Sequence, residues 1–526
     1  MIRIANGLIV DGTGKPGFVG DVLIDGERIR EIGSLGSKES GRTIGTDDCK
    51  TIDAGGCLVT PGFIDAHAHS DAYLILEPDA PSKITQGITT EVNGQCGGSI
   101  APRYGEARLS SDWATLLGER LSWRSLGEYR EALAKAKPAI NTVQFIGHNT
   151  LRSSVIGYAG RVATQDEQRE MERLLVAALD EGGWGLTTGL IYQPGKYATN
   201  EEVTALARVA AKKGGLYATH MRSEGDTILE SIDEVIALCE ATGIRAEISH
   251  LKTSGKKNWA KIDAVLEKIE AGMAKGILLG SDRYPYTLAG TDLDIVLPDW
   301  AQEGGCLAEV GRLKDEGVRK RIVDELNAED RDWSAVTIGG TWSERTKVFS
   351  GKTIDEILST LPPSSFHLPP SPGELVCEIL EADGCKTGAF FGWMCEENLT
   401  KILSRPWIVP GSDASLRAPW GPLGKDFPHP RAYATMPEFY ARVRALGVSR
   451  EEAIARMTGV PARRFGIKGR GILEKGAFAD VIVWREEEFK AKATYEKPHQ
   501  FTEGIKRVFV NGVDSKCRRA GRFLER

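Results

Sequence analysis

The chain has 526 residues and is predicted to fold as a (β/α)8 barrel of the α/β class with two additions. Short apolar segments alternate with amphipathic segments through the middle of the chain, as in a parallel sheet whose strands are joined by helices. About eight such repeats favour a closed barrel over an open sheet. Both ends of the chain instead alternate apolar and polar residues between glycine-rich turns, which is typical of short antiparallel strands.

The two ends are predicted to form one small β-sandwich domain. Residues 1–57 contain IRIANGLIVDGTG and GDVLIDGERIREIG, and residues 470–526 contain GAFADVIVW and GIKRVFVNGV. Each of these segments alternates apolar with polar residues and is bounded by turn-forming residues. Chain termini often lie close together, so we expect the two groups of strands to pair.

The barrel is assigned to residues 58–469. Its strand candidates are GFIDAH, within an apolar run from Leu58 to Ile64, and then GITTEVNG, NTVQFIGH, GWGLTTGLIY, GLYATHM, IRAEISHL, GILLGSDRYPY and WIVPGSD. A further segment, GAFFGWM, would make a ninth strand, so the number of strand candidates exceeds the eight of a closed barrel. The clearest helix follows Thr164, which makes a capping box with Glu167 ahead of an apolar face that ends at Gly182.

Residues 293–387 interrupt the alternation of strands and helices. This stretch contains the helical segment RLKDEGVRKRIVDELN and the proline-rich segment SSFHLPPSPG. A long departure from the repeating pattern is uncommon inside a compact domain and is often functional. We therefore predict an inserted subdomain before the last barrel strand, in the position of a lid.

Composition narrows the class of function. The formal net charge is −6, and no lysine- and arginine-rich run is present, so we expect no nucleic-acid partner. No apolar run approaches the roughly 20 residues that span a bilayer, and residues 1–12 lack the pattern of a signal peptide. We expect a cytoplasmic protein with no membrane association, and the sequence leaves its oligomeric state open.

Side chains that bind metals follow the predicted strands. His67 and His69 come directly after the first strand, and residues two apart on an extended segment point to the same side. Cys96 follows the second strand, His220 the fifth and His250 the sixth. The carboxyl ends of barrel strands meet at one mouth, so these side chains are expected close together. Thiolate and imidazole ligands suit Zn²⁺ better than Mg²⁺ or Ca²⁺.

Each of these residues also has an ordinary structural explanation. A lone cysteine is more often a packed thiol, although Cys96 lies in NGQCGG, where the flanking glycines offer little packing. His220 or His250 alone could be a hydrogen-bonded core histidine. Asp413, after the last strand, is by itself best explained as a helix cap. Their common position at strand ends favours a metal site, from which we leave out His148.

Several longer motifs carry a resemblance that covers nearly the whole chain. They are PGFIDAHAHSD, GITTEVNGQCGGSIAP, GLTTGLIYQPG, ATHMRSEGD, ISHLK, DRYPY, PGSD, HPR, MTGVPARRFGI and GRGILEKGAFADVIVW. The chain resembles the amidohydrolase superfamily and, within it, the N-acyl-D-amino-acid deacylases, or D-aminoacylases. The HxH pair and ADVIVW indicate only the superfamily, whereas Cys96 with ATHMRSEGD, SHLK and DRYPY indicates the deacylase branch. No lysine ends GWGLTTGLIY, where most other branches have a carboxylated lysine that bridges two metals.

The resemblance implies roles by position. Cys96, His220 and His250 match a tight zinc site, whereas His67 and His69 match a second, often weakly occupied position. Asp413 matches the acid/base. The residues that match substrate-binding positions are Tyr192, Lys252, Tyr284 and Arg431.

The chemistry of amide hydrolysis agrees with these roles. Zinc lowers the pKa of bound water to about 7, and the ion or Tyr284 can stabilise the oxyanion. Asp413 can take a proton from the water and return it to the leaving nitrogen. Lys252 should point to the same side as His250, and with Arg431 it could hold a substrate carboxylate. Either charge could instead be a solvated rim residue.

The leading hypothesis is zinc-dependent hydrolysis of the amide bond of N-acyl-D-amino acids. One alternative is a cyclic-amide hydrolase, such as a hydantoinase or dihydroorotase, which the absent bridging lysine disfavours. Another is a non-catalytic scaffold with the amidohydrolase fold, which has no need of the ligands or of Asp413.

The preferred substrate side chain is less well determined. Pro419 and Trp420, with Gly290 near a position where many relatives have serine, favour a neutral, hydrophobic side chain. Arg417 and Lys425 leave an acidic side chain open.

Overall fold

Parallel strands close into the predicted barrel in the computed structural model, which describes residues 1–34, 49–109, 111–362 and 370–526. The barrel strands are β6 (Phe63–Asp65), β7 (Ile88–Asn93), β8 (Asn141–Gln144) continued by β9 (Ile146–Gly147), β10 (Gly185–Gly189), β11 (Leu216–His220), β12 (Ala246–Ile248), β13 (Leu279–Arg283) and β17 (Ile408–Pro410). The amide of Ala66 donates to the carbonyl oxygen of Pro410 at 3.1 Å, which joins the last strand to the first. The predicted fold class is confirmed.

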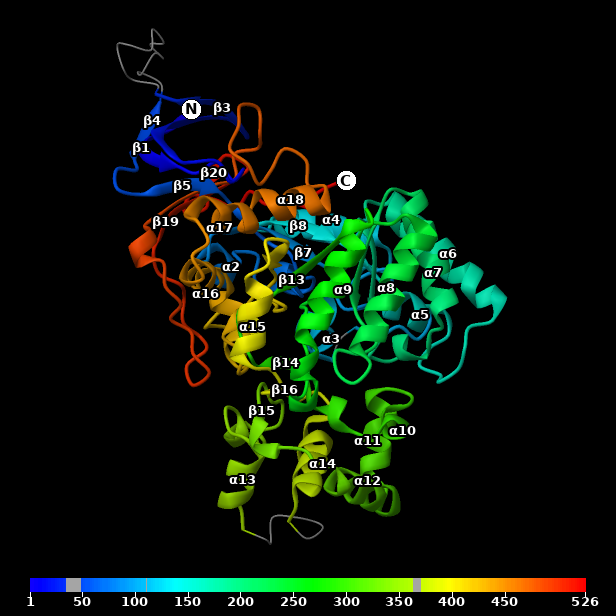
Figure 1. Ribbon diagram of the computed structural model, residues 1–526. Helices are drawn as coiled ribbons and strands as arrows, with labels where there is room; N and C mark the ends of the chain where they lie inside the picture. Colours follow the sequence, from blue (N-terminus) through cyan, green and yellow to red (C-terminus); the bar gives the residue numbers. More distant parts are fainter. Residues whose placement is uncertain (35–48, 110, 363–369) are drawn as a thin grey trace.

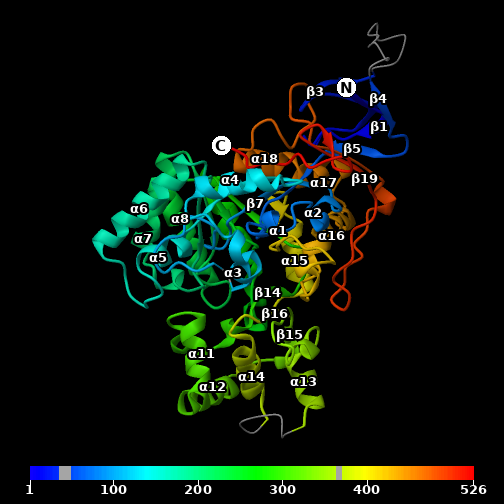
Figure 2. The same cartoon turned by 180° about the vertical axis from the view of Figure 1, so that it is seen from behind.

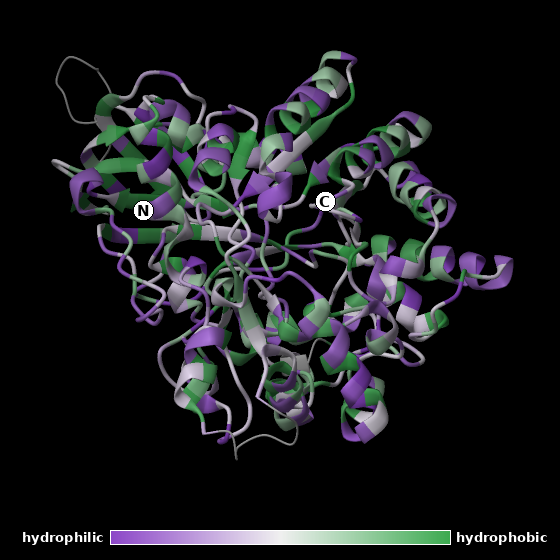
Figure 3. Cartoon of the chain, turned by 60° about the horizontal axis from the view of Figure 1, so that its bottom comes forward, coloured by the Kyte–Doolittle hydropathy of each residue, from purple (hydrophilic) through white to green (hydrophobic). Residues whose placement is uncertain are grey.

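Helices surround this barrel (Figures 1 and 2). They include α4 (Leu126–Ala136), α5 (His148–Val155), α6 (Gln165–Asp180), α7 (Asn200–Lys212), α8 (Ile228–Thr242), α9 (Ile262–Ala274), α15 (Glu396–Leu403), α16 (Arg431–Ala445), α17 (Arg450–Met457) and α18 (Gly459–Phe465). Helix α6 begins with the predicted capping box between Thr164 and Glu167, and it buries an apolar face that includes Met171 and Leu175. Hydrophobic and hydrophilic residues alternate along the helices, as expected for helices with one buried face (Figure 3).

Strands from the two ends of the chain share one sheet at the top of Figure 1. Its N-terminal strands are β1 (Ile2–Ile9), β2 (Phe18–Asp25), β3 (Arg28–Gly33), β4 (Lys50–Asp53) and β5 (Leu58–Pro61). Its C-terminal strands are β18 (Val481–Trp484), β19 (Ile505–Val510) and β20 (Val513–Asp514). Antiparallel pairing of β5 with β18 joins the two groups.

The apolar run from Leu58 to Ile64 is divided between two sheets. Strand β5 belongs to the terminal sheet, whereas β6 begins the barrel. Gly62 lies between them, and a Cβ atom there would lie 2.1 Å from Oγ1 of Thr89. Only glycine therefore lets the chain pass this close to β7 as it enters the barrel.

The inserted residues lie beyond one end of the barrel, at the bottom of Figures 1 and 2. Strand β16 (Gly388–Phe391) pairs there with β14 (Ala289–Asp292) and β15 (Val336–Ile338). GAFFGWM thus contributes a strand to a separate sheet and is not a ninth strand of the barrel. Helices α10 (Asp299–Gln302), α11 (Cys306–Lys314), α12 (Glu316–Ala328), α13 (Ile354–Thr360) and α14 (Pro372–Asp383) complete this part.

The inserted part has a hydrophobic core of its own, which includes Leu313, Ile322, Val336 and Leu380. Of the proline-rich segment SSFHLPPSPG, residues 364–369 lie outside the described residues. Among the described residues of the whole chain, no helix has the length and hydrophobicity needed to cross a membrane.

Candidate metal centre and active site

The predicted metal ligands converge at the mouth of the barrel. Together with Asp413, the predicted acid/base, they form two groups, and within each group the ligand atoms lie within 4.8 Å of one another. One group is His67, His69, Cys96 and Asp413, and the other is Cys96, His220 and His250. Sγ of Cys96 lies 3.3 Å from Nε2 of His67 and 3.3 Å from Nε2 of His250. Cys96 is therefore placed to bridge the two groups.

The backbone is strained where it presents these side chains. Cys96, His250 and Asp413 have positive φ values of 52°, 36° and 47°. Non-glycine residues seldom adopt such angles, and those that do are concentrated at functional sites. Two glycines of NGQCGG are required by close packing, since a Cβ atom on Gly94 would lie 2.3 Å from the carbonyl oxygen of Phe145 and one on Gly97 would lie 2.6 Å from the amide nitrogen of Gly189.

Two buried carboxylates orient the imidazole rings. Oδ2 of Asp282 lies 3.3 Å from Nδ1 of His67, and Oε1 of Glu224 lies 3.0 Å from Nδ1 of His250. Each contact favours a proton on Nδ1 and leaves Nε2 for an ion. Sequence reasoning missed both carboxylates. Glu224 could have been found from its position four residues after His220, and Asp282 from its place in DRYPY, two residues before Tyr284.

The donor set fits zinc. Burial raises the pKa of the Cys96 thiol, but the neighbouring His67 and His250 outweigh that effect and hold the pKa well below its ordinary value. A thiolate next to imidazoles is the ligand chemistry that zinc prefers. Nδ1 of His220 is buried without a hydrogen bond to any described residue, and its Nε2 has only a long contact of 3.3 Å with Oε2 of Glu224. A metal ion would satisfy this ring.

A buried charge network holds the loop that carries Asp413. Asp65 accepts hydrogen bonds from the amide of Ser412 at 2.8 Å and from Nζ of Lys83 at 3.0 Å. Lys83 also donates to the carbonyl oxygen of Ala414 at 3.2 Å. These contacts fix the residues on both sides of Asp413. Lys83 gave no signal in the sequence because it lies on a different element, α2 (Pro81–Ile84).

Asp413 itself contacts two predicted ligands and one predicted substrate residue. Its Oδ1 lies 3.1 Å from Nε2 of His69 and 3.4 Å from Nε2 of His67, and its Oδ2 lies 3.0 Å from Nη1 of Arg431. Burial raises the pKa of Asp413, but Arg431 and the nearby histidines hold it well below its ordinary value. The side chain is therefore ionised and placed beside both ligand groups.

Two of the four predicted substrate-binding residues, Tyr192 and Arg431, line the cavity. Tyr284 lies behind Arg431, whose guanidinium stacks 4.6 Å from its ring centre. Nζ of Lys252 lies 2.5 Å from Oε1 of Glu224, so in this structure it supports the ring of His250. Their roles toward a substrate stay predictions.

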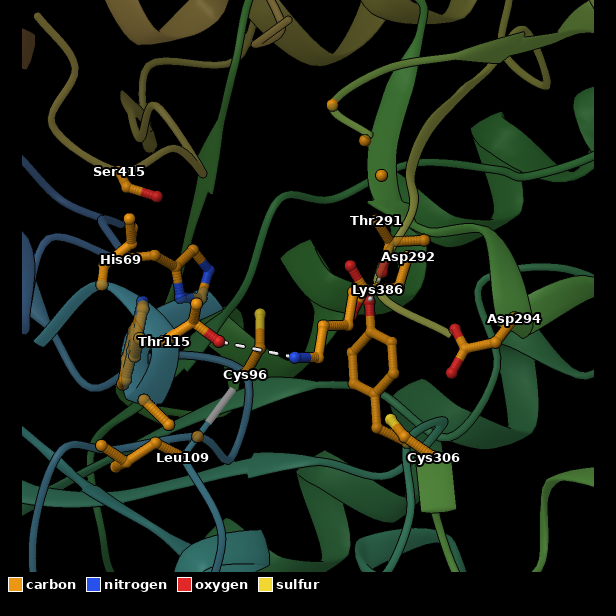
Figure 4. A pocket seen from close by; sticks show the side chains of 18 of the residues that line it. His69, Cys96, Leu109, Thr115, Thr291, Asp292, Asp294, Cys306, Lys386 and Ser415 are labelled. Atoms are coloured by element: carbon orange, nitrogen blue, oxygen red, sulfur yellow. Dashed lines mark hydrogen bonds between the residues drawn. The ribbon is translucent and has the colours of Figure 1, made fainter. Parts of the chain in front are cut away.

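The cavity has a volume of about 1130 Å³ and reaches from the barrel mouth to the inserted part (Figure 4). Gly290, Arg417 and Lys425 line it, as expected for residues near the substrate side chain. Pro419 is not among its lining residues, and Trp420 is 51% exposed with its indole donating to Glu77. These two residues therefore do not supply the apolar surface expected of them.

Two other residues can be set aside. His148 is buried, and its Nε2 lies 2.8 Å from Oε1 of Glu202. It belongs to neither ligand group, as expected. Lys196, the lysine closest after β10, lies on η4 (Gly195–Tyr197) and pairs with Asp299 at 2.7 Å. It is thus engaged outside the metal centre.

Comparisons with known proteins agree with this geometry. A profile described as "Amidohydrolase family" matches residues 50–513. The N-acyl-D-glutamate deacylase of Alcaligenes xylosoxydans xylosoxydans is 32% identical over 532 residues, covering 99% of this chain and 96% of the relative. The D-aminoacylase of the same organism is 32% identical over 517 residues, covering 97% of this chain and 93% of the relative.

Solved structures of deacylases also resemble this chain over its full length. A crystal structure of D-aminoacylase matches with a TM-score of 0.81 and 32% identity, covering 100% of this chain and 99% of that one. The N-acyl-D-glutamate deacylase of Bordetella bronchiseptica, complexed with zinc and a phosphonate mimic of the tetrahedral intermediate, matches with a TM-score of 0.81 and 31% identity. It too covers 100% of this chain and 99% of that one.

Proposed function

This chain belongs to the amidohydrolase family, and we propose that it is a zinc-dependent deacylase of N-acyl-D-amino acids, which releases a carboxylate and a free D-amino acid. The observation that carries this function is the cluster of thiolate, imidazole and carboxylate side chains at the floor of a cavity large enough for such a substrate. Relatives that match nearly the full chain are named for this activity.

Cys96, His220 and His250 would hold the tightly bound zinc ion, and His67 and His69 with Cys96 would hold a weaker second ion. When bound, zinc polarises the amide carbonyl and lowers the pKa of water to about 7. Glu224 fixes the orientation of the His250 ring, and Asp282 fixes that of the His67 ring. Such outer carboxylates typically contribute 10–100-fold to metal affinity or activity.

Asp413 moves the protons. Its carboxylate takes a proton from the attacking water and returns it to the leaving nitrogen, a role that contributes typically 10²–10⁴-fold. In the free protein Arg431 pairs with Asp413, which weakens the carboxylate as a base. A substrate carboxylate that binds the same guanidinium would share its charge and raise the basicity of Asp413. Arg431 would thus couple substrate binding to proton transfer.

The remaining predicted residues would position the substrate around this pair. The hydroxyl of Tyr284 is buried and has no hydrogen-bond partner among the described residues, so it can donate to an oxygen of the substrate. The hydroxyl of Tyr192 lies 3.3 Å from Oγ1 of Thr291, at the contact between barrel and inserted part. Lys252 would support the ring of His250 through Glu224 and would contact the substrate only if its ammonium group left Glu224.

Substrate preference provides the direct test of this function. We expect release of free amine from N-acetyl-D-amino acids and none from their L-enantiomers. We also expect a higher kcat/KM for N-acetyl-D-leucine or N-acetyl-D-methionine than for N-acetyl-D-glutamate. The guanidinium of Arg417 already pairs with Asp426 at 2.8 Å, so Arg417 could hold an acidic side chain only by giving up this ion pair.

The measurement is amine release across matched D and L pairs. A tenfold preference for glutamate would contradict the preference for neutral side chains while leaving the deacylase function intact. A preference for L-enantiomers would contradict the function itself.

We propose that residues 293–387 act as a lid over bound substrate. They supply Asp294 and Lys386 to the cavity wall and lie beyond one end of the barrel, so closure would exclude water from the reaction. Hydrogen exchange should slow in this segment when a product or inhibitor is added. The barrel helices α7 and α8 provide the control region, and unchanged protection throughout the segment would contradict the lid.

A further inference from the structure

A second group of metal-binding side chains lies in the cavity wall formed by the inserted part. Asp294 is on η6 (Leu293–Val296), and Cys306 and Glu309 are on α11. Their ligand atoms lie within 4.8 Å of one another. In Figure 4 Asp294 and Cys306 lie on the opposite side of the cavity from His69. We propose that these three residues bind a divalent cation of the zinc class, at a site separate from the catalytic one.

The negative charge of this group is only partly compensated, by the charge of Arg312, which lowers the pKa of Glu309. Among the described residues, no basic side chain forms an ion pair with Asp294 or Glu309, although the two carboxylates are neighbours. Burial and the adjacent Glu309 raise the pKa of Asp294 well above its ordinary value, and burial raises the pKa of Glu309 to about 7. Two neighbouring carboxyl groups with raised pKa values retain a proton between them. A divalent cation could replace this proton and would balance the two negative charges better.

A buried acceptor atom of this group also lacks a partner. The side chain of Glu309 is 3% exposed, and its Oε2 has no hydrogen-bond partner among the described residues. Buried polar atoms in folded proteins are nearly always satisfied, and an unsatisfied one indicates a missing water or ion. The thiol of Cys306 next to it makes a metal ion the better explanation.

The ligand types select the ion. A sulfur donor with two carboxylates favours Zn²⁺ or Cd²⁺ over Mg²⁺ and Ca²⁺, which take oxygen ligands. Burial and the nearby acids raise the pKa of the Cys306 thiol to about 12, so the thiol is protonated in the metal-free protein. Binding therefore releases the thiol proton and the proton shared by the carboxylates to solvent, and affinity should rise with pH.

An ion here would stiffen the cavity wall. It would tie η6 to α11, which are separated in the chain by α10 and by the turn of Gly304 and Gly305, two residues with positive φ. Cys385, whose thiol contacts Glu309, lies next to Lys386, and Nζ of Lys386 reaches across the cavity to Oγ1 of Thr115 at 3.4 Å. The site thus lies beside a contact between the inserted part and the barrel.

Cadmium provides the test, because a cadmium–thiolate bond absorbs in the ultraviolet and both proposed sites contain one cysteine thiolate. The full chain with Cys96→Ala removes the thiolate of the catalytic site. We expect this variant to keep cadmium–thiolate absorbance that saturates at about one ion per chain and grows with pH. Adding Cys306→Ala should abolish the absorbance, and adding Glu309→Gln should weaken binding at least tenfold.

Two controls keep the result interpretable. Adding Cys517→Ala to the Cys96→Ala chain removes an exposed thiol and should change nothing. Circular dichroism of each variant checks folding, and cadmium should raise the melting temperature of the Cys96→Ala chain but not of the chain that also has Cys306→Ala. Absence of absorbance in the Cys96→Ala chain, or its persistence after Cys306→Ala, would overturn this site and leave the deacylase function unaffected.

Discussion

Replacing Asp413 by asparagine is expected to lower kcat by two to four orders of magnitude, the roughly 10²–10⁴-fold typical of general acid–base catalysis. Asparagine keeps the size of the side chain but cannot accept and return a proton. The fold and the zinc content should stay close to those of the parent protein, because Cys96, His220 and His250 are untouched. Steady-state kinetics and metal analysis of the same preparation measure both quantities.

Asp226→Asn is a matched control, since Asp226 pairs with Lys257 at 2.8 Å and both side chains are largely exposed. Its turnover should equal that of the parent protein. If Asp413→Asn stays within tenfold of the parent protein, another residue is the base. A loss of zinc in Asp413→Asn would instead show that the carboxylate acts as a ligand, which its place in the group with His67 and His69 allows.

Replacing Cys96 by alanine is expected to abolish activity and to remove catalytic zinc. Sγ of Cys96 is the one atom shared by both ligand groups, so its loss leaves each group without its thiolate. Removing a histidine such as His69 affects only one group, and we expect it to reduce activity less. Zinc analysis after dialysis, with amine release from an N-acetyl-D-amino acid, measures the two effects.

Cys517→Ala provides the comparison for an exposed thiol and should keep full activity and metal. The parent protein should carry about one tightly bound catalytic zinc ion per chain. Retention of that ion by Cys96→Ala would contradict the ligand assignment. Any ion held by Cys306 and its neighbours is distinguished by its loss on replacement of Cys306.

Local chemistry made a large part of this protein predictable from sequence. Strand–helix alternation predicted the barrel, and the capping box at Thr164 predicted the start of α6. His67, His69 and Cys96 directly follow strands, and carboxyl ends of parallel strands meet at one mouth in any such barrel. The ligands could therefore be proposed without knowing distances. Hydrophobic periodicity and the position of a residue at the end of a strand depend only on short segments of the chain, so both can be read directly from the sequence.

Tertiary structure decided which distant residues meet. Glu224, Asp282 and Lys83 orient the metal ligands and the catalytic loop through contacts between residues far apart in the chain, and no local pattern encodes such contacts. GAFFGWM has the apolar pattern of a barrel strand, yet β16 pairs with β14 and β15, because strand composition does not specify a partner. Trp420 was expected to face the cavity and instead faces solvent. The sequence by itself determined the barrel and the chemical type of its metal site, whereas packing between distant segments determined which side chains support that site and which reach the substrate cavity.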